Sequence, residues 1–428
     1  MSTTTPVAWR KLFLYQVYLR SHTPSGTIKE FITDLDRIRD LGVDMIYFMP
    51  IHPIGKIKRK GSLGCPYSIS DYRAINPEYG TIDDFRDAVD AIHARDMKVM
   101  IDVVYNHTSH DSKLLAEHPE YFLQKDGKFF SKEPHWSDVQ DLDYAAGQPL
   151  WDELVDTLLH WMKLGVDGFR FDVTSFLPLA FLEYANQKMR ALNPDVVLLS
   201  ESIHGGYLRH MRNRGFSILS ESEIYQVFDM AYDYDVHPYF EAYLADKIPL
   251  NTYLRELLRQ EEIYPQNYIK LRNLENHDLK RIAHVLHNDP DKIDNWTAFN
   301  FFLKGSTMIY AGEECSATLQ PSLFEKEPVD WSGRDISPLI RKLAEIAKYD
   351  HLTYGAFDII LQEKEVVCLT YKYGKETLVG VFNVGSEQGE ISLDIPAGRY
   401  QNLLSNSVLT VSSAKFELVK EPLIFLVR

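Results

Sequence analysis

The chain has 428 residues, of which 45% are hydrophobic and 25% charged, and its formal net charge is −15 at pH 7. This composition is ordinary for a soluble globular protein and excludes wholesale disorder. The negative charge argues against nucleic acid or an anionic membrane surface as the main partner. Because the length exceeds that of a typical single domain, we expect one large domain and a smaller one.

The N-terminal segment and the cysteines indicate the compartment. The segment MSTTTPVAWRKLFLYQVYLR has no basic head followed by an unbroken apolar run, so no signal peptide is expected. No later segment approaches the roughly 18 apolar residues of a membrane-spanning helix. Cys65, Cys315 and Cys368 are odd in number and widely spaced, which disfavours a disulfide framework or a zinc site. We therefore expect a cytoplasmic protein with buried thiols.

Short apolar runs alternate with longer amphipathic stretches as far as residue 349. The runs typical of strands are residues 12–19, 45–50, 98–104, 168–173, 196–201, 227–232, 268–274 and 306–312. Helical spacing is found between them, in residues 27–41, 83–95, 150–164, 179–192, 292–302 and 338–348. This alternation predicts an α/β fold in which parallel strands close into a (β/α)8 TIM barrel.

Two segments depart from the barrel pattern. Residues 105–148 are rich in His, Pro, Gly, Asp and aromatic side chains, which predicts a short excursion after the third strand, packed over the barrel mouth. After residue 352, period-two runs such as VVCLTYKYG and EPLIFLV predict a C-terminal antiparallel β-sandwich domain. We therefore assign 1–104 and 149–351 to the catalytic barrel, 105–148 to the excursion (domain B) and 352–428 to the C-terminal domain.

Four polar segments end strand-like runs, namely DVVYNH (102–107), GFRFD (168–172), LLSE (198–201) and LENHD (274–278). They carry three acidic residues, Asp172, Glu201 and Asp278. Because the carboxyl ends of parallel strands meet at one mouth of a barrel, we expect these side chains to converge. Converging carboxylates suit cleavage of a glycosidic bond, in which one acts as nucleophile and another as proton donor.

In this order, the four segments closely resemble the α-amylase family, family thirteen of the glycoside hydrolases. Further matches are GVDMIYFMP (42–50), PYSISDY (66–72), DLDY (141–144) and STMIYAGEE (306–314), so that the resemblance covers nearly the whole chain. It implies a small α-glucan-active member of the family. The implied activity is that of a retaining α-glycosidase that hydrolyses α-glucosidic bonds in maltodextrins or related α-glucans by double displacement.

The resemblance also implies a role for each acidic residue. Asp172 would be the nucleophile, Glu201 the general acid/base and Asp278 the third carboxylate, which stabilises the transition state. Arg170 lies two residues before Asp172 on a strand and points to the same face, so we expect it to hold the pKa of Asp172 low. Glu201 must instead hold a proton near neutral pH, which burial and nearby negative charge would favour.

Four further residues are implied to surround the sugar. His107 and His277 would donate hydrogen bonds to its hydroxyls, and Tyr67 would stack on its apolar face. Asp102 would orient Arg170 or neighbouring groups rather than react.

The chain departs from the family pattern after the nucleophile. Ser175 and Phe176 stand where many endo-acting α-amylases have a Lys-His pair, which puts endo-cleavage of long polymers in doubt and removes an element near the usual calcium site. Asn106 is a candidate calcium ligand because its carbonyl oxygen suits that ion. The excursion offers no obvious carboxylate cluster, so we expect that no metal or other cofactor is required.

Several other functions share these motifs. A transglycosylase, or a member acting on α-1,6, trehalose-like or sucrose-like bonds, uses the same intermediate, and Val173 is typical of several α-1,6-acting relatives. From a different class, a barrel that has lost catalysis would act as a sugar-binding or interaction protein, although all three carboxylates are present here. The predicted partner is an α-glucan or oligosaccharide, with neither nucleic acid nor membrane, and the motifs leave the oligomeric state open.

Overall fold

The computed structural model describes residues 5–428, and a closed barrel of parallel strands lies at its centre. Around the barrel the order is β1 (Phe13–Val17), β12 (Ser306–Tyr310), β11 (Lys270–Arg272), β10 (Met230–Tyr232), β9 (Val197–Ser200), β8 (Gly168–Phe171), β3 (Lys98–Val103) and β2 (Met45–Phe48). Each strand lies inside one of the predicted runs. The predicted barrel is therefore confirmed.

Alternation along the strands explains how the barrel is filled. Met45 and Tyr47 belong to an inner cluster with Leu14, Met100 and Met308, whereas Ile46 and Phe48 pack into the outer core. Because successive side chains of a strand point to opposite faces, every barrel strand needs apolar residues at adjacent positions. This two-sided burial is the reason for the near-continuous apolar runs.

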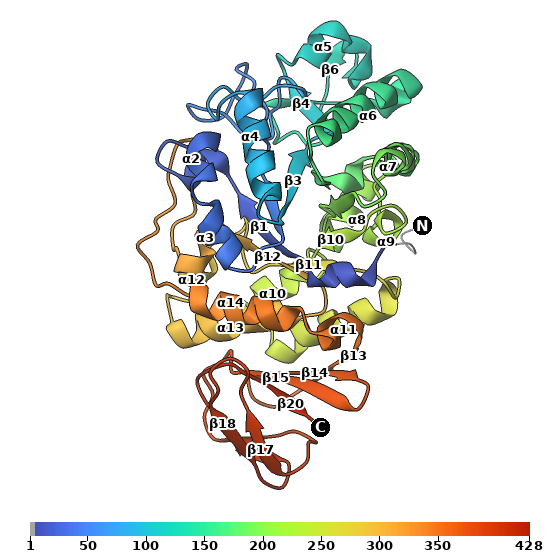
Figure 1. Ribbon diagram of the computed structural model, residues 1–428. Coiled ribbons are helices and arrows are strands. Elements are labelled where there is room, and N and C mark those ends of the chain that lie inside the picture. The colour runs from blue at the N-terminus through green and yellow to red at the C-terminus, as the bar shows by residue number, and fades with distance from the viewer. Residues whose placement is uncertain (1–4) are drawn as a thin grey trace.

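Helices cover the outside of the barrel (Figure 1). They include α2 (Ile28–Ile32), α3 (Leu35–Asp40), α4 (Ile82–His93), α6 (Gln148–Lys163), α7 (Leu179–Leu192), α8 (Gly205–Asn213), α9 (Glu221–Ile224), α10 (His237–Leu244), α11 (Leu250–Ile263), α13 (Pro290–Phe302) and α14 (Ser337–Ala347). Five of the six predicted helices match α4, α6, α7, α13 and α14 within about two residues at each end.

The predicted helix over 27–41 is instead two helices. The hydroxyl of Thr33 donates to the carbonyl of Glu30, and the carboxylate of Asp34 binds His22 and Arg37. Short polar side chains that bond to nearby backbone groups compete with helix continuation, which explains the break between α2 and α3.

The segment between β3 and α6 forms a small unit of its own. Strand β4 (His107–Ser109) pairs antiparallel with β7 (Val139–Asp141), and α5 (Lys113–Glu117) and a hairpin of β5 (Gln124–Lys125) and β6 (Lys128–Phe129) lie between them in sequence. Figure 1 shows this unit at the opposite end of the molecule from the C-terminal strands. We call it the excursion.

The C-terminal domain is antiparallel, as predicted. Strands β13 (Ala356–Ile360), β14 (Val367–Tyr373), β15 (Glu376–Phe382) and β20 (Leu423–Val427) form one sheet. Two antiparallel strand pairs, β16 (Glu390–Ser392) with β19 (Lys415–Glu417) and β17 (Gly398–Gln401) with β18 (Val408–Val411), share a buried apolar cluster with that sheet. The cluster holds Cys368, Val381, Ile391, Val411 and Phe425, which come from both sides of the domain.

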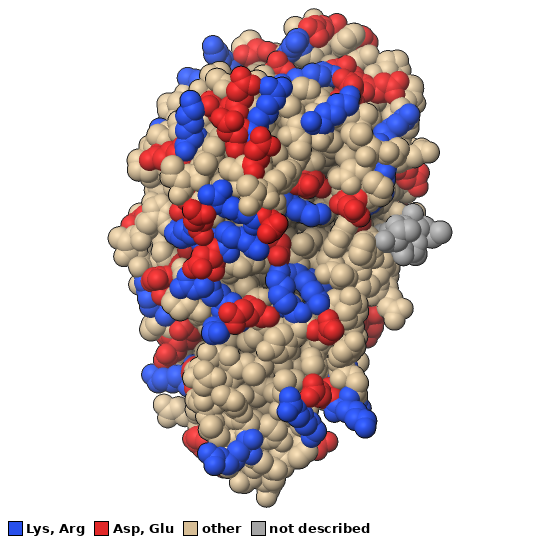
Figure 2. Space-filling model, viewed as in Figure 1, with Lys and Arg blue, Asp and Glu red and all other residues tan. Residues whose placement is uncertain are grey.

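The surface of the molecule is mixed in charge. On the face in Figure 2, acidic and basic side chains are interspersed over the barrel, and the C-terminal domain carries fewer of them. Among residues 5–428, no helix is both long and apolar enough to cross a membrane.

Candidate active site

A cavity of about 200 Å³ lies at the carboxyl ends of the barrel strands. It is lined by Lys60, Cys65, Tyr67, His107, Trp136, Asp138, Val139, Asp172, Val173, Glu201, Asp278, Leu323 and Phe324. All three predicted carboxylates are among these residues, together with Tyr67 and His107. We call this cavity the catalytic pocket.

Arg170 holds the carboxylates together from below the pocket. Its Nη1 donates to Oδ1 of Asp102 at 2.7 Å and to Oδ1 of Asp172 at 2.9 Å, and its Nη2 lies 3.0 Å from Oε2 of Glu201. The guanidinium is fully buried. Because Arg170 and Asp172 are two residues apart, β8 directs both side chains to the same side. One fixed positive charge thus contacts three carboxylates, and the cluster keeps an excess of negative charge.

This excess overturns the expected pKa of the predicted nucleophile. Burial, followed by the negative charge of Glu201, raises the pKa of Asp172 well above its ordinary value, and Arg170 offsets only part of this rise. The prediction that Arg170 holds this pKa low is wrong, because its charge is shared with Asp102 and Glu201. Burial likewise raises the pKa of Asp102 to about 6, against the opposing effect of Arg170. Carboxyl groups that interact this strongly titrate together, so their pKa values belong to the cluster as a whole.

Glu201 is held by the residue that follows Asp172. The backbone N–H of Val173 donates to Oε2 of Glu201 at 2.6 Å. Val173 has a φ of 37° and a ψ of 47°, which is the left-handed region. A β-branched residue in this region is strained by roughly 1–3 kcal/mol, and such strain is concentrated at functional sites.

Tyr67, Asp102 and His277 form a hydrogen-bonded chain beside the carboxylates. The hydroxyl of Tyr67 donates to Oδ2 of Asp102 at 2.9 Å and lies 2.6 Å from Nε2 of His277. The side-chain amide of Gln16 donates to Nδ1 of His277, so the ring carries its proton on Nε2 and donates it to Tyr67. Burial lowers the pKa of His277 to about 3, which keeps the ring neutral.

The three carboxylates differ in exposure. The side chain of Asp278 is 47% exposed, whereas those of Asp172 and Glu201 are 9% and 12% exposed. Nε2 of His277 lies 3.2 Å from Oδ2 of Asp278. Asp278 therefore stands at the open side of the pocket, and the other two stand at its base.

His107 enters the pocket from the excursion. Its ring packs against Trp136 with centroids 5.4 Å apart, and the Nδ2 of Asn106 lies 3.1 Å from its Nδ1. Burial lowers the pKa of His107 to about 4. Asn106, the candidate calcium ligand, is fully buried outside the pocket lining. Within residues 5–428, no group of three or more His, Cys, Asp or Glu side chains is placed to hold a metal ion.

The contacts that join the loops around the pocket were not predicted from the sequence. Lys60 forms an ion pair with Asp138 at 3.0 Å, which joins the loop after β2 to the excursion. The same loop bonds to the loop after β12, where the N–H of Ser62 donates to Glu325 at 2.7 Å. Both contacts join residues that are far apart in sequence, so no local sequence pattern predicts them.

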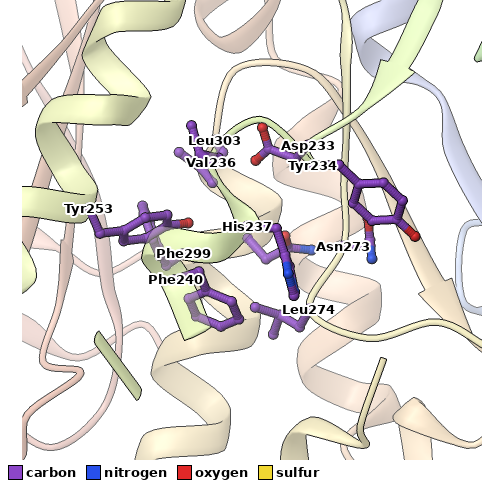
Figure 3. A pocket seen from close by; sticks show the side chains of 11 residues that line it. Asp233, Tyr234, Val236, His237, Phe240, Tyr253, Asn273, Leu274, Phe299 and Leu303 are labelled. Carbon is purple, nitrogen blue, oxygen red and sulfur yellow. The ribbon is translucent and has the colours of Figure 1, made fainter. Parts of the chain in front are cut away.

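A smaller hollow lies between the segments that follow β10 and β11 and the helices α10, α11 and α13 (Figure 3). Its volume of about 20 Å³ is room for about one water molecule. In Figure 3 the ring of Tyr234 is turned away from Phe240 and Tyr253, and its hydroxyl accepts from Asn276. This hollow is too small for a sugar, whereas the catalytic pocket, at about 200 Å³, has room for one and is lined by all three predicted carboxylates.

Comparison with known proteins identifies the two domains. Residues 16–335 match the family model described as the α-amylase catalytic domain, and residues 359–425 match the model of the bacterial α-amylase C-terminal domain. The structure is similar to an α-amylase from Lactobacillus plantarum, with 39% identity, a TM-score of 0.96 and coverage of 99% and 100% of the two chains. It is also similar to a maltogenic α-amylase from Thermotoga neapolitana, with 29% identity, a TM-score of 0.88 and coverage of 98% and 99%.

Curated relatives share parts of the chain. An α-1,4-glucan:maltose-1-phosphate maltosyltransferase from Burkholderia pseudomallei is 34% identical over 44% of this chain and 19% of its own length. A maltosyltransferase of the same name from Streptomyces coelicolor is 26% identical over 89% of this chain and 60% of its own length. The chain thus spans less than two thirds of the length of these relatives. The catalytic-domain model matches well over half of the chain, and Asp172, Glu201 and Asp278 all lie within the matched residues. The chain therefore belongs to the α-amylase family of glycoside-active enzymes.

Proposed function

We propose that this protein is a retaining α-glycosidase that hydrolyses α-glucosidic bonds in maltodextrins or related α-glucans. The observation that carries the proposal is the contact of one buried guanidinium, that of Arg170, with both Asp172 and Glu201 at the base of a sugar-sized pocket. A shared guanidinium favours the separation of about 5–5.5 Å between carboxyl groups that double displacement requires.

The reaction has two steps. Asp172 attacks the anomeric carbon while Glu201 gives its proton to the departing glycosidic oxygen, which leaves a covalent glycosyl ester and a free sugar hydroxyl. Glu201, now ionised, then takes a proton from water as the water oxygen displaces Asp172 from the same carbon. Two inversions restore the original α configuration.

The neighbouring groups serve these steps. The positive charge of Arg170 stabilises the ionised form of Asp172, and Asp102 orients the guanidinium through its 2.7 Å hydrogen bond. Asp278 stands at the open side, where it would bind ring hydroxyls and stabilise the oxocarbenium-like transition state. His107 and Tyr67 line the pocket, and His277 acts through Tyr67 and Asp278 rather than from the lining itself.

The charge of the pocket favours a neutral donor sugar. Four of its lining residues are carboxylates, Asp138, Asp172, Glu201 and Asp278. Lys60 is the cation among the lining residues, and it is paired with Asp138. A phosphate group on the donor would meet net negative charge at short range, which costs binding free energy. The name of the maltosyltransferase relatives therefore does not transfer to this chain as a substrate.

The closed loops favour short substrates or chain ends. The Lys60–Asp138 ion pair and the Ser62–Glu325 hydrogen bond join three loops around the pocket. A polymer that crosses the site from both sides would have to part them. Together with Ser175 and Phe176 in place of a Lys-His pair, this favours action on oligosaccharides or from a chain end.

Transglycosylation is the second candidate, since several curated relatives are maltosyltransferases. A sugar hydroxyl in place of water would attack the same glycosyl ester. Chromatography of maltotriose digests separates the two: hydrolysis gives only shorter sugars, whereas transfer also gives products longer than maltotriose.

The test is the Asp172→Asn variant, with Asp143→Asn as a control outside the pocket lining, where the amide oxygen can still accept from the N–H of Ala145. Hydrolysis of an aryl α-maltoside should fall at least about 10³-fold in Asp172→Asn, because the amide cannot form the ester. Asp143→Asn should keep wild-type activity. If wild type and Asp172→Asn are equally slow, the protein is a sugar-binding homologue without catalysis.

The compartment and cofactors belong to the same proposal. Cys65, Cys315 and Cys368 are free thiols, which supports a reducing cytoplasm. Every step above uses side chains of this chain, so we propose that the reaction requires no cofactor.

A further inference from the structure

Lys132 is a buried lysine at the base of the excursion. It is 9% exposed, and its Nζ donates to Oδ1 of Asn106 at 2.7 Å. The same Nζ lies 3.8 Å from Oδ2 of Asp141 and 5.4 Å from the ring centroid of Phe176. A lysine is rarely buried unless it is paired, so these contacts require an explanation.

The backbone of Lys132 is fixed as firmly as its side chain. Its N–H donates to Oδ2 of Asp141 at 3.0 Å, and its carbonyl accepts from Nη2 of Arg214 at 2.7 Å. The other carboxylate oxygen of Asp141 accepts from Ser131 at 2.9 Å. Lys132 thus joins the excursion to α8 and to the end of β3 at one point.

The oxygens around the Lys132 ammonium group, those of Asn106 and Asp141, are of the type that binds calcium, but they already accept hydrogen bonds. Calcium takes about six to eight oxygen ligands at about 2.3–2.6 Å. Oδ1 of Asn106 already accepts from an ammonium group, and the carboxylate of Asp141 accepts from Ser131 and from the backbone of Lys132. The site does not fit calcium, because a lysine side chain occupies the space next to the candidate ligand.

We propose that Lys132 replaces a metal ion as the cation that anchors the excursion to the barrel, and that through Asn106 it sets the tautomer of His107. An ammonium group supplies one positive charge and hydrogen-bond donors to carbonyl and carboxylate oxygens, as a bound cation would. The face of Phe176 supplies a cation–π contact to the same group.

The second half of the proposal follows from donors and acceptors. An ammonium group only donates, so the oxygen of the Asn106 amide must face Lys132. The NH₂ of that amide then faces Nδ1 of His107, at 3.1 Å, and donates to it. Nδ1 is therefore unprotonated, and the neutral ring carries its proton on Nε2. This makes Nε2–H the hydrogen-bond donor of the His107 ring, next to the backbone of Tyr67, and its donation to a sugar is the step that rests on the proposed function.

The experiment uses the full-length protein, the variant Lys132→Met and the control Lys128→Met, whose lysine is exposed on the β5–β6 hairpin. Melting temperatures are measured in a chelator and in millimolar calcium. We expect the wild-type Tm to agree within about 1 °C in the two buffers. We expect Lys132→Met to melt about 5–10 °C lower in both buffers, because it leaves Asp141 buried without its cation. Lys128→Met should melt as the wild type does.

The melting temperatures show whether the Lys132 ammonium group or a calcium ion anchors the excursion. A wild-type Tm that falls in chelator, or calorimetric binding of calcium to the wild type, would overturn the proposal even if Lys132→Met does not fold. Equal melting of Lys132→Met and wild type would overturn it as well. None of these readings depends on activity, so they are independent of the proposed glycosidase function.

The tautomer is read by NMR on protein labelled with ¹⁵N-histidine, with His107→Gln used to identify the signal. The wild type should show a bare Nδ1 and a protonated Nε2 on His107. Lys132→Met should lose this preference, because the Asn106 amide is then free to turn. An unchanged tautomer in a folded Lys132→Met would limit Lys132 to anchoring the excursion and would contradict its positioning role.

Discussion

The backbone N–H of Val173 donates to Oε2 of Glu201 at 2.6 Å, so the residue after the proposed nucleophile holds the proposed acid/base. The two strands β8 and β9 are neighbours in the barrel, which places these residues side by side. One local turn therefore sets the positions of both reacting carboxyl groups.

Glu201→Gln should separate the two roles of this side chain. The amide oxygen of glutamine still accepts from Val173, but the side chain cannot donate a proton to a leaving group. We expect the kcat/KM for maltotriose to fall about 10²–10⁴-fold. The loss for maltosyl fluoride should be much smaller, because fluoride leaves without protonation. Equal losses for both substrates would show that Glu201 is not the acid.

Val173→Gly tests whether the left-handed turn is strained. Glycine adopts a positive φ at no steric cost and keeps the N–H that Glu201 accepts. We expect the Tm to be at least that of the wild type, although glycine elsewhere costs about 0.5–1 kcal/mol. Thr174→Gly, at the next position, should lower the Tm, because it loses the hydrogen bond from Thr174 to Phe171. If Val173→Gly melts more than about 3 °C below wild type, the left-handed backbone at Val173 is not strained.

The strands were predictable because a barrel strand is apolar on both faces, as Ile46 and Tyr47 illustrate from the two sides of β2. The convergence of Asp172, Glu201 and Asp278 followed from their positions at strand ends. In contrast, helix α11 was not predicted, although Leu250, Leu254 and Leu257 have helical spacing and are buried.

The features that escaped prediction depend on contacts between distant residues. The raised pKa of Asp172 depends on burial and on the negative charge of Glu201, which together outweigh the local effect of Arg170. The Lys60–Asp138 ion pair joins two loops whose conformations no periodic pattern specifies. Sequence reasoning therefore found the reacting groups, and only the fold revealed how they are balanced and enclosed.

Opening the pocket should change the preferred substrate length. Lys60→Ala removes the ion pair to Asp138 that joins the loop after β2 to the excursion. Because the side chain of Asp138 is 4% exposed and loses its cation, the variant should also melt below the wild type. We expect the kcat/KM for amylopectin to rise relative to that for maltotriose by about threefold or more, measured by reducing-sugar release. A ratio equal to that of wild type would contradict the closure of the pocket by these loops.

His52 should make stability depend on pH. Burial lowers its pKa to about 4, and its Nδ1 lies 3.2 Å from the carbonyl of Ala74. The unfolded chain, with a histidine pKa of about 6.5, binds more protons between pH 6.5 and 4, so stability is lost as the pH falls through this window. The shift corresponds to about 3 kcal/mol for full protonation.

The matching variant is His52→Asn, whose amide can still donate to Ala74. Its Tm should fall less than that of the wild type between pH 6.5 and 4.5, because one of the titrating groups is gone. Parallel falls in the two proteins would mean that His52 is not a source of the pH dependence.

The activity at low pH should report the carboxylate cluster. A nucleophile must be ionised, and the pKa of Asp172 is raised by burial and by Glu201. The acid limb of kcat/KM should therefore lie above the value of about 3.9 of a free aspartate. A pH–rate profile on an aryl maltoside measures it, and an acid limb at or below that value would contradict the raised pKa.

The most direct measurement is to trap the glycosyl intermediate and find the residue that carries it. A fluorinated maltosyl fluoride, which forms the ester faster than water removes it, is incubated with the protein, and peptides are analysed by mass spectrometry. The account predicts one glycosyl adduct, on Asp172, and none in Asp172→Asn. An adduct on Glu201 or Asp278, or turnover with inversion of the anomeric centre, would contradict it.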